Sequence, residues 1–354
     1  VTISTSSDDT SITVNANATD DVGVYYYYYK LDNGDEVRSE DPTYKFEGLN
    51  KDQTYTISVR VVDAAGNEAS ATDEVTVGLR AGDAILAASK PQAQTTDWTN
   101  NGQGVTYYYT GANPNNWVQF GEFWWRIIRI NGDGSIRMIY QGTSANTTGT
   151  GTQIGTSAFN SSYNRSYYVG LVHDGSSQHG SGQNSTIMNT LNTWYNNNLA
   201  SYEEDYIDTG AGFCSDRNLQ SGSWSATGNH DYAAYGRLVN SNSPSLQCSD
   251  ADILSQDNGR LPNPIGLITA DEAALAGVTW NNPKSSYLNT GQYYWTMSPY
   301  WYYNGYAYVF VVLDYGDLGN WRVNSTSGVR PVINLKSAIA ISGSGSTSDP
   351  FKVG

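Results

Sequence analysis

Hydrophobic and polar residues alternate in short runs over the first 78 residues. The runs are SITVNANA, VYYYYYKLD, YKFEGL, YTISVRVVD and DEVTV. Turn signals such as Asp32-Asn33-Gly34 and Ala65-Gly66-Asn67 separate them. Alternate side chains of a strand point to opposite faces, so we expect the tyrosines of Tyr25–Tyr29 to divide between a core and a sheet surface. The pattern predicts an all-β sandwich over residues 1–78.

The alternation stops after Gly78. Residues 79–92, LRAGDAILAASKPQ, are expected to form a linker with one or two helical turns before Pro91. Beyond it, the apolar runs Phe123–Ile130 and Ser135–Tyr140 flank Asn131-Gly132-Asp133-Gly134 and predict a β-hairpin. Further strands are predicted at Tyr293–Met297, Tyr306–Leu313, Trp321–Asn324 and Val329–Leu335.

Two segments have helical periodicity instead. In Ser185–Tyr195 the apolar residues form one stripe behind Ser185 as N-cap. Thr269–Ala276 begins with the capping pair Thr269 and Glu272, and Gly277 is expected to end it. Together with the strands, these helices predict an α+β domain over residues 93–354, in which two helices pack against a small, loop-rich antiparallel sheet.

Composition and charge narrow the functional classes. Charged residues make up 15% and aromatic residues 13% of the 354 residues, and the net charge is −15. A polyanion would be repelled, so no nucleic-acid partner is expected. No run of 18 apolar residues occurs, so no membrane span is expected in this chain. The chain begins VTISTSSDDT, without Met, and we expect it to be a processed part of a longer, exported protein.

Cys214 and Cys248 are the two cysteines, and neither belongs to a CxxC motif. A disulfide closing the loop between them would stabilise the fold by roughly 3–4 kcal/mol, and an exported chain permits it. We expect this disulfide. Two buried free thiols, or a catalytic or metal-binding thiol, are the alternatives.

The usual residues of catalytic sites are sparse. His173, His179 and His230 lie in Ser/Gly/Asn-rich surroundings and are expected to be exposed loop residues. Glu203-Glu204-Asp205 is interpreted as a solvated charge run, because consecutive acids rarely face one site. No HExxH, GxSxG or phosphate-binding loop occurs. We therefore expect no enzyme activity and no catalytic residues.

The first 78 residues resemble the immunoglobulin-like and fibronectin-III-like modules of bacterial surface proteins. The resemblance rests on Asp20-Asp21-Val22-Gly23, Leu49, Thr54-Tyr55 and Asp63-Ala64-Ala65-Gly66-Asn67. It implies a spacer that holds a terminal domain away from the cell. Asp20, Asp21 and Asp63 are candidate calcium ligands, because calcium prefers carboxylate oxygens, but turn capping explains these residues equally well.

The segment from Tyr300 to Ser325, YWYYNGYAYVFVVLDYGDLGNWRVNS, has the composition of a paratope. An aromatic sheet core is the alternative. The segment contains no Lys, Glu, Gln or Met. These residues and Trp cannot be reached from an AAC or AAT codon when only its adenines are replaced. If the codons of this segment vary by replacement of their adenines, Trp301 and Trp321 are positions that the replacement leaves unchanged, and we call them fixed template positions.

The second domain resembles the variable proteins of diversity-generating retroelements, which have a C-type-lectin-like fold related to that of the formylglycine-generating enzyme. The matching landmarks are Trp125-Arg126, Cys214-Ser215-Asp216-Arg217, Tyr235-Gly236-Arg237-Leu238, Gly266-Leu267-Ile268-Thr269-Ala270-Asp271-Glu272, Tyr294-Trp295-Thr296-Met297-Ser298-Pro299 and Gly328-Val329-Arg330-Pro331-Val332. The catalytic cysteines of that enzyme have no counterpart here, because the contexts of Cys214 and Cys248 do not match.

The resemblance implies an extracellular or cell-surface display protein whose C-terminal surface binds a protein or another surface structure. The expected ligand-binding positions are Tyr300, Tyr302, Tyr303, Asn304, Tyr306, Tyr308, Phe310, Val312, Asp314, Tyr315, Asp317, Asn320, Arg322 and Asn324. Phe310 and Val312 are also ordinary core residues. The alternative is a non-diversified module that binds a glycan, since Trp and Tyr stack on sugar rings. The lectin-type calcium triplets Glu-Pro-Asn and Gln-Pro-Asp are absent.

Overall fold

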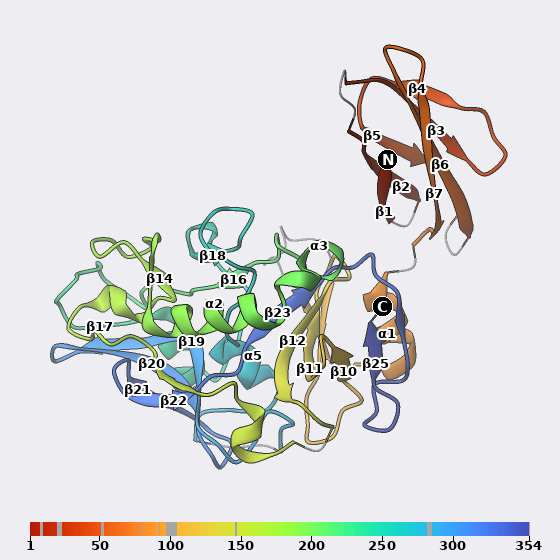
Figure 1. Cartoon of the computed structure of the whole chain (residues 1–354). Helices are drawn as coiled ribbons and strands as arrows, with labels where there is room; N and C mark the ends of the chain where they lie inside the picture. Colours follow the sequence, from red (N-terminus) through yellow and green to blue (C-terminus); the bar gives the residue numbers. More distant parts are fainter. Residues whose placement is uncertain are drawn as a thin grey trace. The chain divides into compact units, whose positions relative to one another are not determined.

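The chain forms two compact units, Val1–Ala84 and Ile85–Gly354. The structure, a computed structural model, describes residues 1–7, 10–19, 23–50, 53–78, 80–91, 93–96, 105–145, 147–281 and 285–353 (Figure 1). The boundary between the two units, at Ala84 and Ile85, lies within helix α1 (Ala81–Ser89). This helix occupies most of the predicted linker and is slightly longer than the one or two turns that we expected.

In the described residues of the first unit, seven strands make two antiparallel sheets. One sheet has the order β1-β2-β5 and the other β4-β3-β6-β7. Side chains from both sheets, such as Val14, Tyr29 and Ile57, share one core, so the unit is a two-layer sandwich. The strands are β1 (Thr2–Ser7), β2 (Ser11–Asn17), β3 (Val24–Leu31), β4 (Val37–Ser39), β5 (Thr43–Glu47), β6 (Thr54–Asp63) and β7 (Glu68–Thr76).

The tyrosines of β3 divide between the two faces of their sheet, as predicted. Tyr29 is fully buried in the core. Tyr26 and Tyr28 are only partly buried, and each ring lies beneath a guanidinium group. Arg38 is 4.2 Å from the ring centre of Tyr26, and Arg60 is 4.1 Å from that of Tyr28. The outer rings are therefore covered by cations, which shields part of their apolar surface from water.

Of the three candidate calcium ligands, Asp20 and Asp21 lie outside the described residues. The Asp63 carboxylate accepts hydrogen bonds of 2.8 Å from the backbone N–H groups of Ala65 and Asn67, and one of 2.6 Å from the Asn67 side-chain amide. These bonds cap the turn between β6 and β7. Within the described parts of the chain, no group of three His, Cys, Asp or Glu residues is placed to hold a metal ion.

Two larger sheets dominate the second unit. One has the order β23-β12-β11-β10-β25-β24, with β9 paired to β11 and β8 to β9. Its strands are β8 (Ala93–Thr96), β9 (Val105–Tyr108), β10 (Trp117–Phe120), β11 (Phe123–Ile130), β12 (Ile136–Gly142), β23 (Val332–Leu335), β24 (Ile341–Ser342) and β25 (Phe351–Val353). The predicted hairpin is present as β11 and β12, which pair antiparallel.

The second sheet has the order β13-β22-β19-β20-β21, with β17 paired to β19. Its strands are β13 (Thr156–Ala158), β17 (His230–Asp231), β19 (Tyr294–Tyr303), β20 (Tyr306–Val312), β21 (Leu318–Arg322) and β22 (Thr326–Gly328). The described part of the unit also contains two short pairs: β14 (Val172–His173) with β15 (Gln183–Asn184), and β16 (Phe213–Cys214) with β18 (Ile253–Leu254).

The antiparallel sheet that we expected needs two corrections. There are two large sheets in place of one small one, and the pairs β10–β25 and β19–β22 are parallel. Parallel neighbours arise because distant segments return to the same sheet, which a pattern of apolar positions does not reveal. The broader expectation of a β-rich fold with few helices is met.

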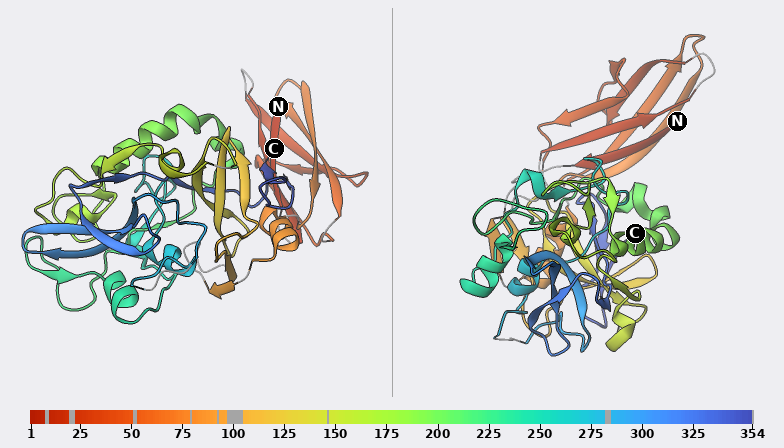
Figure 2. Two further views of the ribbon diagram at one scale, coloured as in Figure 1. Left: turned by 90° about the horizontal axis from the view of Figure 1, so that it is seen from below. Right: turned by 90° about the vertical axis from the view of Figure 1, so that its left-hand side faces the viewer.

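In the described part of the second unit, the α-helices that follow α1 are α2 (Thr186–Asn198), α3 (Glu203–Tyr206), α4 (Ala233–Tyr235) and α5 (Ala270–Leu275). Both predicted helices are confirmed. Ser185 caps α2 by accepting a hydrogen bond from the Met188 N–H, and Thr269 and Glu272 form the capping box of α5. Figure 2 shows α2, in green, along the outside of the unit. Over the described residues, no helix has the length and apolar character needed to cross a membrane.

A buried ion cluster joins α5 to the first large sheet. Glu272 lies 2.9 Å from Arg129 Nε on β11 and 2.5 Å from Arg137 Nε on β12, and all three side chains are at most 3% exposed. Burial alone would raise the pKa of Glu272, but the positive charges of Arg137 and Arg129 hold this pKa below its ordinary value. The carboxylate is therefore ionised and links three elements of the core.

Arg330 is a second buried cation of this unit. It is fully buried, and its guanidinium group donates hydrogen bonds to Tyr140 O at 3.0 and 3.2 Å and to Gln141 Oε1 at 2.7 Å. The guanidinium carbon also lies 4.8 Å from the ring centre of Tyr294. Arg330 thus ties the segment before β23 to β12 and β19, which is a structural role.

Candidate ligand-binding surface

The predicted ligand-binding positions lie on β19, β20, β21, the turns that join them and the turn from β21 to β22. Asn304 and Gly305 form the two-residue turn between β19 and β20, since Tyr303 pairs with Tyr306. Both turn residues have positive φ, 49° and 80°, which is what the tight turns of β-hairpins require. In Figure 1 and in the left view of Figure 2, this hairpin reaches the edge of the second unit.

Solvent exposure divides the fourteen positions. Tyr303 and Tyr315 are 54% and 60% exposed. Nine positions are exposed or half-buried: Tyr303, Asn304, Tyr306, Tyr308, Asp314, Tyr315, Asn320, Arg322 and Asn324. The other five are buried: Tyr300, Tyr302, Phe310, Val312 and Asp317. A ligand cannot reach these five side chains in this structure, so their assignment to the binding surface is corrected.

Aromatic packing explains why part of the segment is buried. Phe310 follows Tyr306 and Tyr308 on the same face of β20, but Tyr300 and Trp280 cover it, with ring centres 4.7 and 6.4 Å away. Trp280 lies outside the segment.

The other buried positions have partners of their own. The Tyr302 hydroxyl donates to Asn164 O at 2.9 Å. Val312 pairs with Tyr294 and Leu318 inside the sheet. Asp317 is held through its backbone, because its carbonyl accepts the Leu313 N–H and closes the next turn, and burial raises the pKa of its side chain.

Several of the accessible side chains contact one another across the strands. Arg322 pairs with Tyr308 in the ladder, and its Nε donates to the Tyr308 hydroxyl at 3.2 Å. The guanidinium carbon of Arg322 lies 3.7 Å from the ring centre of Tyr306. The ring of Tyr163 stacks on the ring of Tyr306, and the two ring centres are 5.2 Å apart. The cation and the rings therefore hold each other in place before any ligand binds.

Seven accessible positions belong to this end of the sheet, and we call them the hairpin surface. They are Tyr303, Asn304, Tyr306, Tyr308, Asn320, Arg322 and Asn324. A hollow of about 360 Å³ is lined by Tyr308, Asn320, Trp321, Arg322 and Ser325. Its volume is within the range of small-molecule sites, and a side chain of a larger partner would also fit.

Asp314 and Tyr315 are not part of the hairpin surface. They follow β20 at the end opposite to the Asn304-Gly305 turn. The seven residues of β20 span roughly 20 Å at the usual rise of a strand. Asp314 instead contacts the Tyr293 hydroxyl, and this hydrogen bond raises the pKa of Tyr293. Asp314 and Tyr315, which we expected to share one binding surface with the hairpin tyrosines, therefore lie apart from it.

Sequence reasoning missed Tyr163 and Ser325 as neighbours of this surface, and Trp280 as the residue that covers Phe310. Tyr163 and Trp280 are distant from the segment in sequence and reach it only through the fold. The turn, in contrast, had a sequence signal that we did not use, because Asn-Gly between two apolar runs is the strongest short-range indicator of a hairpin.

The two tryptophans of the segment are held by contacts with other aromatic rings. Trp301 is half-buried, with its ring centre 5.8 Å from that of Tyr235 and 5.9 Å from that of Tyr308. Trp321 stacks on Tyr293 at 4.9 Å. Each ring has more than one aromatic neighbour, so both residues support the strands that carry the accessible positions. Their role as fixed template positions stays a prediction.

The histidines differ from the expectation of exposed loop residues. His173 is buried. Its pKa is lowered, chiefly by burial and in addition by the positive charge of Arg217. His179 and His230 are half-buried. The cause is local packing: rings of Tyr167 and Tyr168 enclose His173, and such contacts are not visible in a Ser/Gly-rich sequence.

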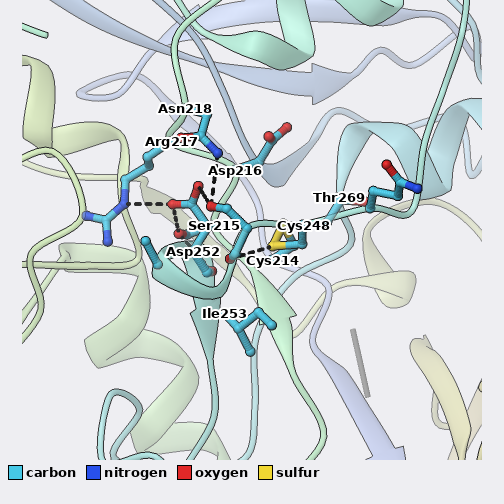
Figure 3. The surroundings of a disulfide bond; sticks show 12 residues. Cys214, Ser215, Asp216, Arg217, Asn218, Cys248, Asp252, Ile253 and Thr269 are labelled. Atoms are coloured by element: carbon cyan, nitrogen blue, oxygen red, sulfur yellow. Dashed lines mark hydrogen bonds and ion pairs between the residues drawn. A yellow bond between two sulfur atoms is a disulfide. The ribbon is translucent and has the colours of Figure 1, made fainter. Parts of the chain in front are cut away.

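The predicted disulfide between Cys214 and Cys248 is present, and Figure 3 shows a buried polar cluster beside it. Asp252 accepts hydrogen bonds from Ser215 Oγ and Ser249 Oγ, both at 2.9 Å, and contacts the ring of His179 at 2.8 Å. A catalytic triad would place the imidazole between serine and aspartate. Here the serine and the histidine both contact the aspartate, so the cluster matches a structural network that fixes the disulfide loop.

No family model matches the chain, and no curated protein matches it. Among solved structures, the chitinase ChiA74 from Bacillus thuringiensis is similar to 42% of this chain, with 17% sequence identity and a TM-score of 0.21. The match spans 17% of the chitinase chain. A TM-score this low carries no argument about the fold or the activity of the present protein.

Serine substitutions are expected to separate the buried tyrosines from the hairpin surface. Tyr300→Ser and Tyr302→Ser should lower the free energy of unfolding by about 3 kcal/mol, because each leaves a cavity. Tyr303→Ser, Tyr306→Ser and Tyr308→Ser should change it by less than about 1 kcal/mol. Denaturation followed by tryptophan fluorescence measures this. All ten tryptophans follow residue 84, so the signal reports on the second unit.

Tyr302 and Tyr303 are a matched pair, adjacent in sequence and opposite in exposure. If the three hairpin tyrosines destabilise the unit as much as Tyr300 and Tyr302 do, the segment is a core strand and the binding surface should be abandoned.

Proposed function

We propose that this protein binds a ligand outside the cell through the hairpin surface, without catalysis. The observation that carries the proposal is the cluster of Tyr306, Tyr308 and Arg322 beside an open hollow. The other side chains of β20 are buried, whereas Asn320 and Trp321 of β21 are half-buried and line the hollow. Rigid aromatic rings and an arginine are the residues that contribute most to protein interfaces. Their mutual contacts reduce the entropy that binding would otherwise cost.

The proposed location rests on the disulfide, since such bonds persist mainly in oxidising compartments. The two antiparallel sheets of the first unit, three and four strands with one shared core, support its interpretation as an immunoglobulin-like or fibronectin-III-like spacer. The C-type-lectin-like character of the second unit is likewise a proposal, supported by the landmark residues and by the β-rich fold.

We propose further that the hairpin surface is diversified by a retroelement. The absence of Lys, Glu, Gln and Met from residues 300–325 supports this, and so does the exposure of most positions that adenine replacement would alter. Both features would be coincidental in a fixed binding module. The ligand would then differ between variants while the scaffold stays the same.

The genomic neighbourhood of the gene tests this proposal. We expect a reverse-transcriptase gene nearby, and a near-identical copy of the DNA for residues 300–325 that carries adenines at the codons of the hairpin surface. A complete flanking sequence without both features would contradict diversification, and the hairpin surface would then be a fixed binding site.

A further inference from the structure

The outer face of α2 is a second surface with an unusual chemistry. Thr186, Asn189, Thr190, Thr193 and Asn197 recur at the spacing of one helical face. Asn189, Thr193 and Asn197 are exposed. The helix has 13 residues, TIMNTLNTWYNNN, and none of them is charged. Figure 2 shows this helix on the outside of the unit.

Helix stability does not explain this choice of residues. Thr and Asn form helices less readily than Ala, Lys or Glu, by up to about 0.7 kcal/mol per residue. Packing fixes the inner face, where Ile187, Met188 and Leu191 are buried. On the outer face, side-chain hydrogen bonds to neighbouring segments account for Thr186, Asn189 and Thr190. They do not account for the exposed Thr193 and Asn197. Exposed positions are where good helix formers are expected. Residues that weaken local structure without an evident packing gain often mark a functional site.

A groove runs along this face. It has a volume of about 590 Å³, and its lining includes Ile154 and Trp194 as well as the polar face of α2. This volume is within the range of small-ligand sites. Trp194 is half-buried, and its ring centre lies 5.3 Å from that of Phe123 and 5.6 Å from that of Tyr140. The indole is therefore held in one place beside the groove.

The polar groups of the groove are neutral, and several are fixed in direction. Thr193 Oγ1 donates to Asn189 O at 2.9 Å, which leaves the oxygen lone pairs of Thr193 as acceptors. In the described part of the chain, the Asn197 side-chain amide has no hydrogen-bond partner. An amide has donors on one side and an acceptor on the other, so it can bind two neighbouring hydroxyl groups.

We propose that this groove binds an uncharged saccharide. The neutral amides and hydroxyls match the hydroxyl groups of a sugar, and the indole of Trp194 matches its apolar ring face. The lining has no cation for a phosphate or carboxylate ligand, and the net charge of −15 would repel an anion. This site lies on α2, apart from the hairpin surface with its three tyrosines, three asparagines and one arginine, and it does not depend on the function proposed for that surface.

The test is binding of soluble neutral tetrasaccharides of glucose, N-acetylglucosamine, xylose and mannose to the whole chain. Saturation-transfer NMR and calorimetry would measure it, with tetragalacturonic acid as the charged comparison. We expect at least one neutral tetrasaccharide to bind and the acidic one not to bind. Asn197→Ala should weaken binding roughly three- to tenfold, as the loss of a hydrogen bond does.

Two further variants make the result specific. Thr193→Lys introduces a better helix former at an exposed position and fills the groove with a charged side chain, so binding should be lost while the unfolding midpoint is not lowered. Asn196→Ala is the matched control, since Asn196 is exposed on the same helix but does not line the groove, and binding should be unchanged.

Three outcomes would overturn the proposal: no neutral tetrasaccharide binds, Thr193→Lys binds like the wild type, or binding is lost in Tyr308→Ser instead. The last result would assign the saccharide to the hairpin surface.

Discussion

Replacing Glu272 by alanine is expected to lower the free energy of unfolding of the second unit by about 5 kcal/mol. Removing one partner of a buried ion pair costs about 3–5 kcal/mol, because the remaining charge stays buried without compensation. Here two arginines, Arg129 and Arg137, would lose the same carboxylate. The capping box of α5 would also be lost, since Glu272 accepts the Thr269 N–H at 2.9 Å, and a lost cap adds about 1 kcal/mol.

Chemical denaturation followed by tryptophan fluorescence measures this effect. The control is Glu204→Ala, which removes an exposed carboxylate of α3 and should change stability by no more than about 0.5 kcal/mol. Glu272→Gln should have an intermediate effect, because it removes the charge but keeps an acceptor for Thr269. Equal stability of Glu272→Ala and Glu204→Ala would show that the buried cluster does not hold α5 to the sheet.

Arg330→Ala is expected to lower the free energy of unfolding by about 4 kcal/mol. Hydrogen bonds from a charged donor contribute about 1.5–3 kcal/mol each, and they are not additive. The substitution leaves Tyr140 O and Gln141 Oε1 without this donor and opens a cavity the size of a guanidinium group. Arg330→Lys should recover only part of the loss, because an ammonium group does not reproduce the planar fork of donors.

Arg322→Ala is the matched comparison, since Arg322 is exposed on the hairpin surface. We expect it to retain the unfolding midpoint and, for a variant whose ligand is known, to weaken ligand binding. Arg330→Ala should show the opposite behaviour. An unchanged midpoint together with lost binding in Arg330→Ala would reverse its assignment from scaffold to binding site.

Local signals in the sequence predicted the regular elements well. Alternation of apolar and polar residues located β2 and β6, a run of tyrosines located β3, and capping residues located the start of α2 and α5. Short polar strands such as β1 and β4 were missed, because their pairing partners stabilise them and their own composition does not. The strand predicted at Trp321–Asn324 lies earlier, at Leu318–Arg322, where its register with β20 is fixed by the turn before it.

The binding surface was predictable only in part. Alternate side chains of a strand share a face, which correctly placed Tyr306, Tyr308 and Phe310 on one face of β20. This alternation does not indicate which other residues cover that face. Trp280 and Tyr300 cover Phe310, whereas Tyr308 stays accessible beside Arg322. The distinction depends on contacts between segments that are distant in sequence, so it required the structure.

The central claim is that residues 300–325 combine a variable ligand-binding surface with a constant scaffold. Sequencing the same locus in sister isolates tests it most directly. We predict that substitutions concentrate at the seven positions of the hairpin surface, while Trp301, Trp321 and the buried Tyr300, Tyr302 and Phe310 stay constant. Substitutions that are no more frequent on the hairpin surface than at other exposed positions of the second unit would contradict the claim.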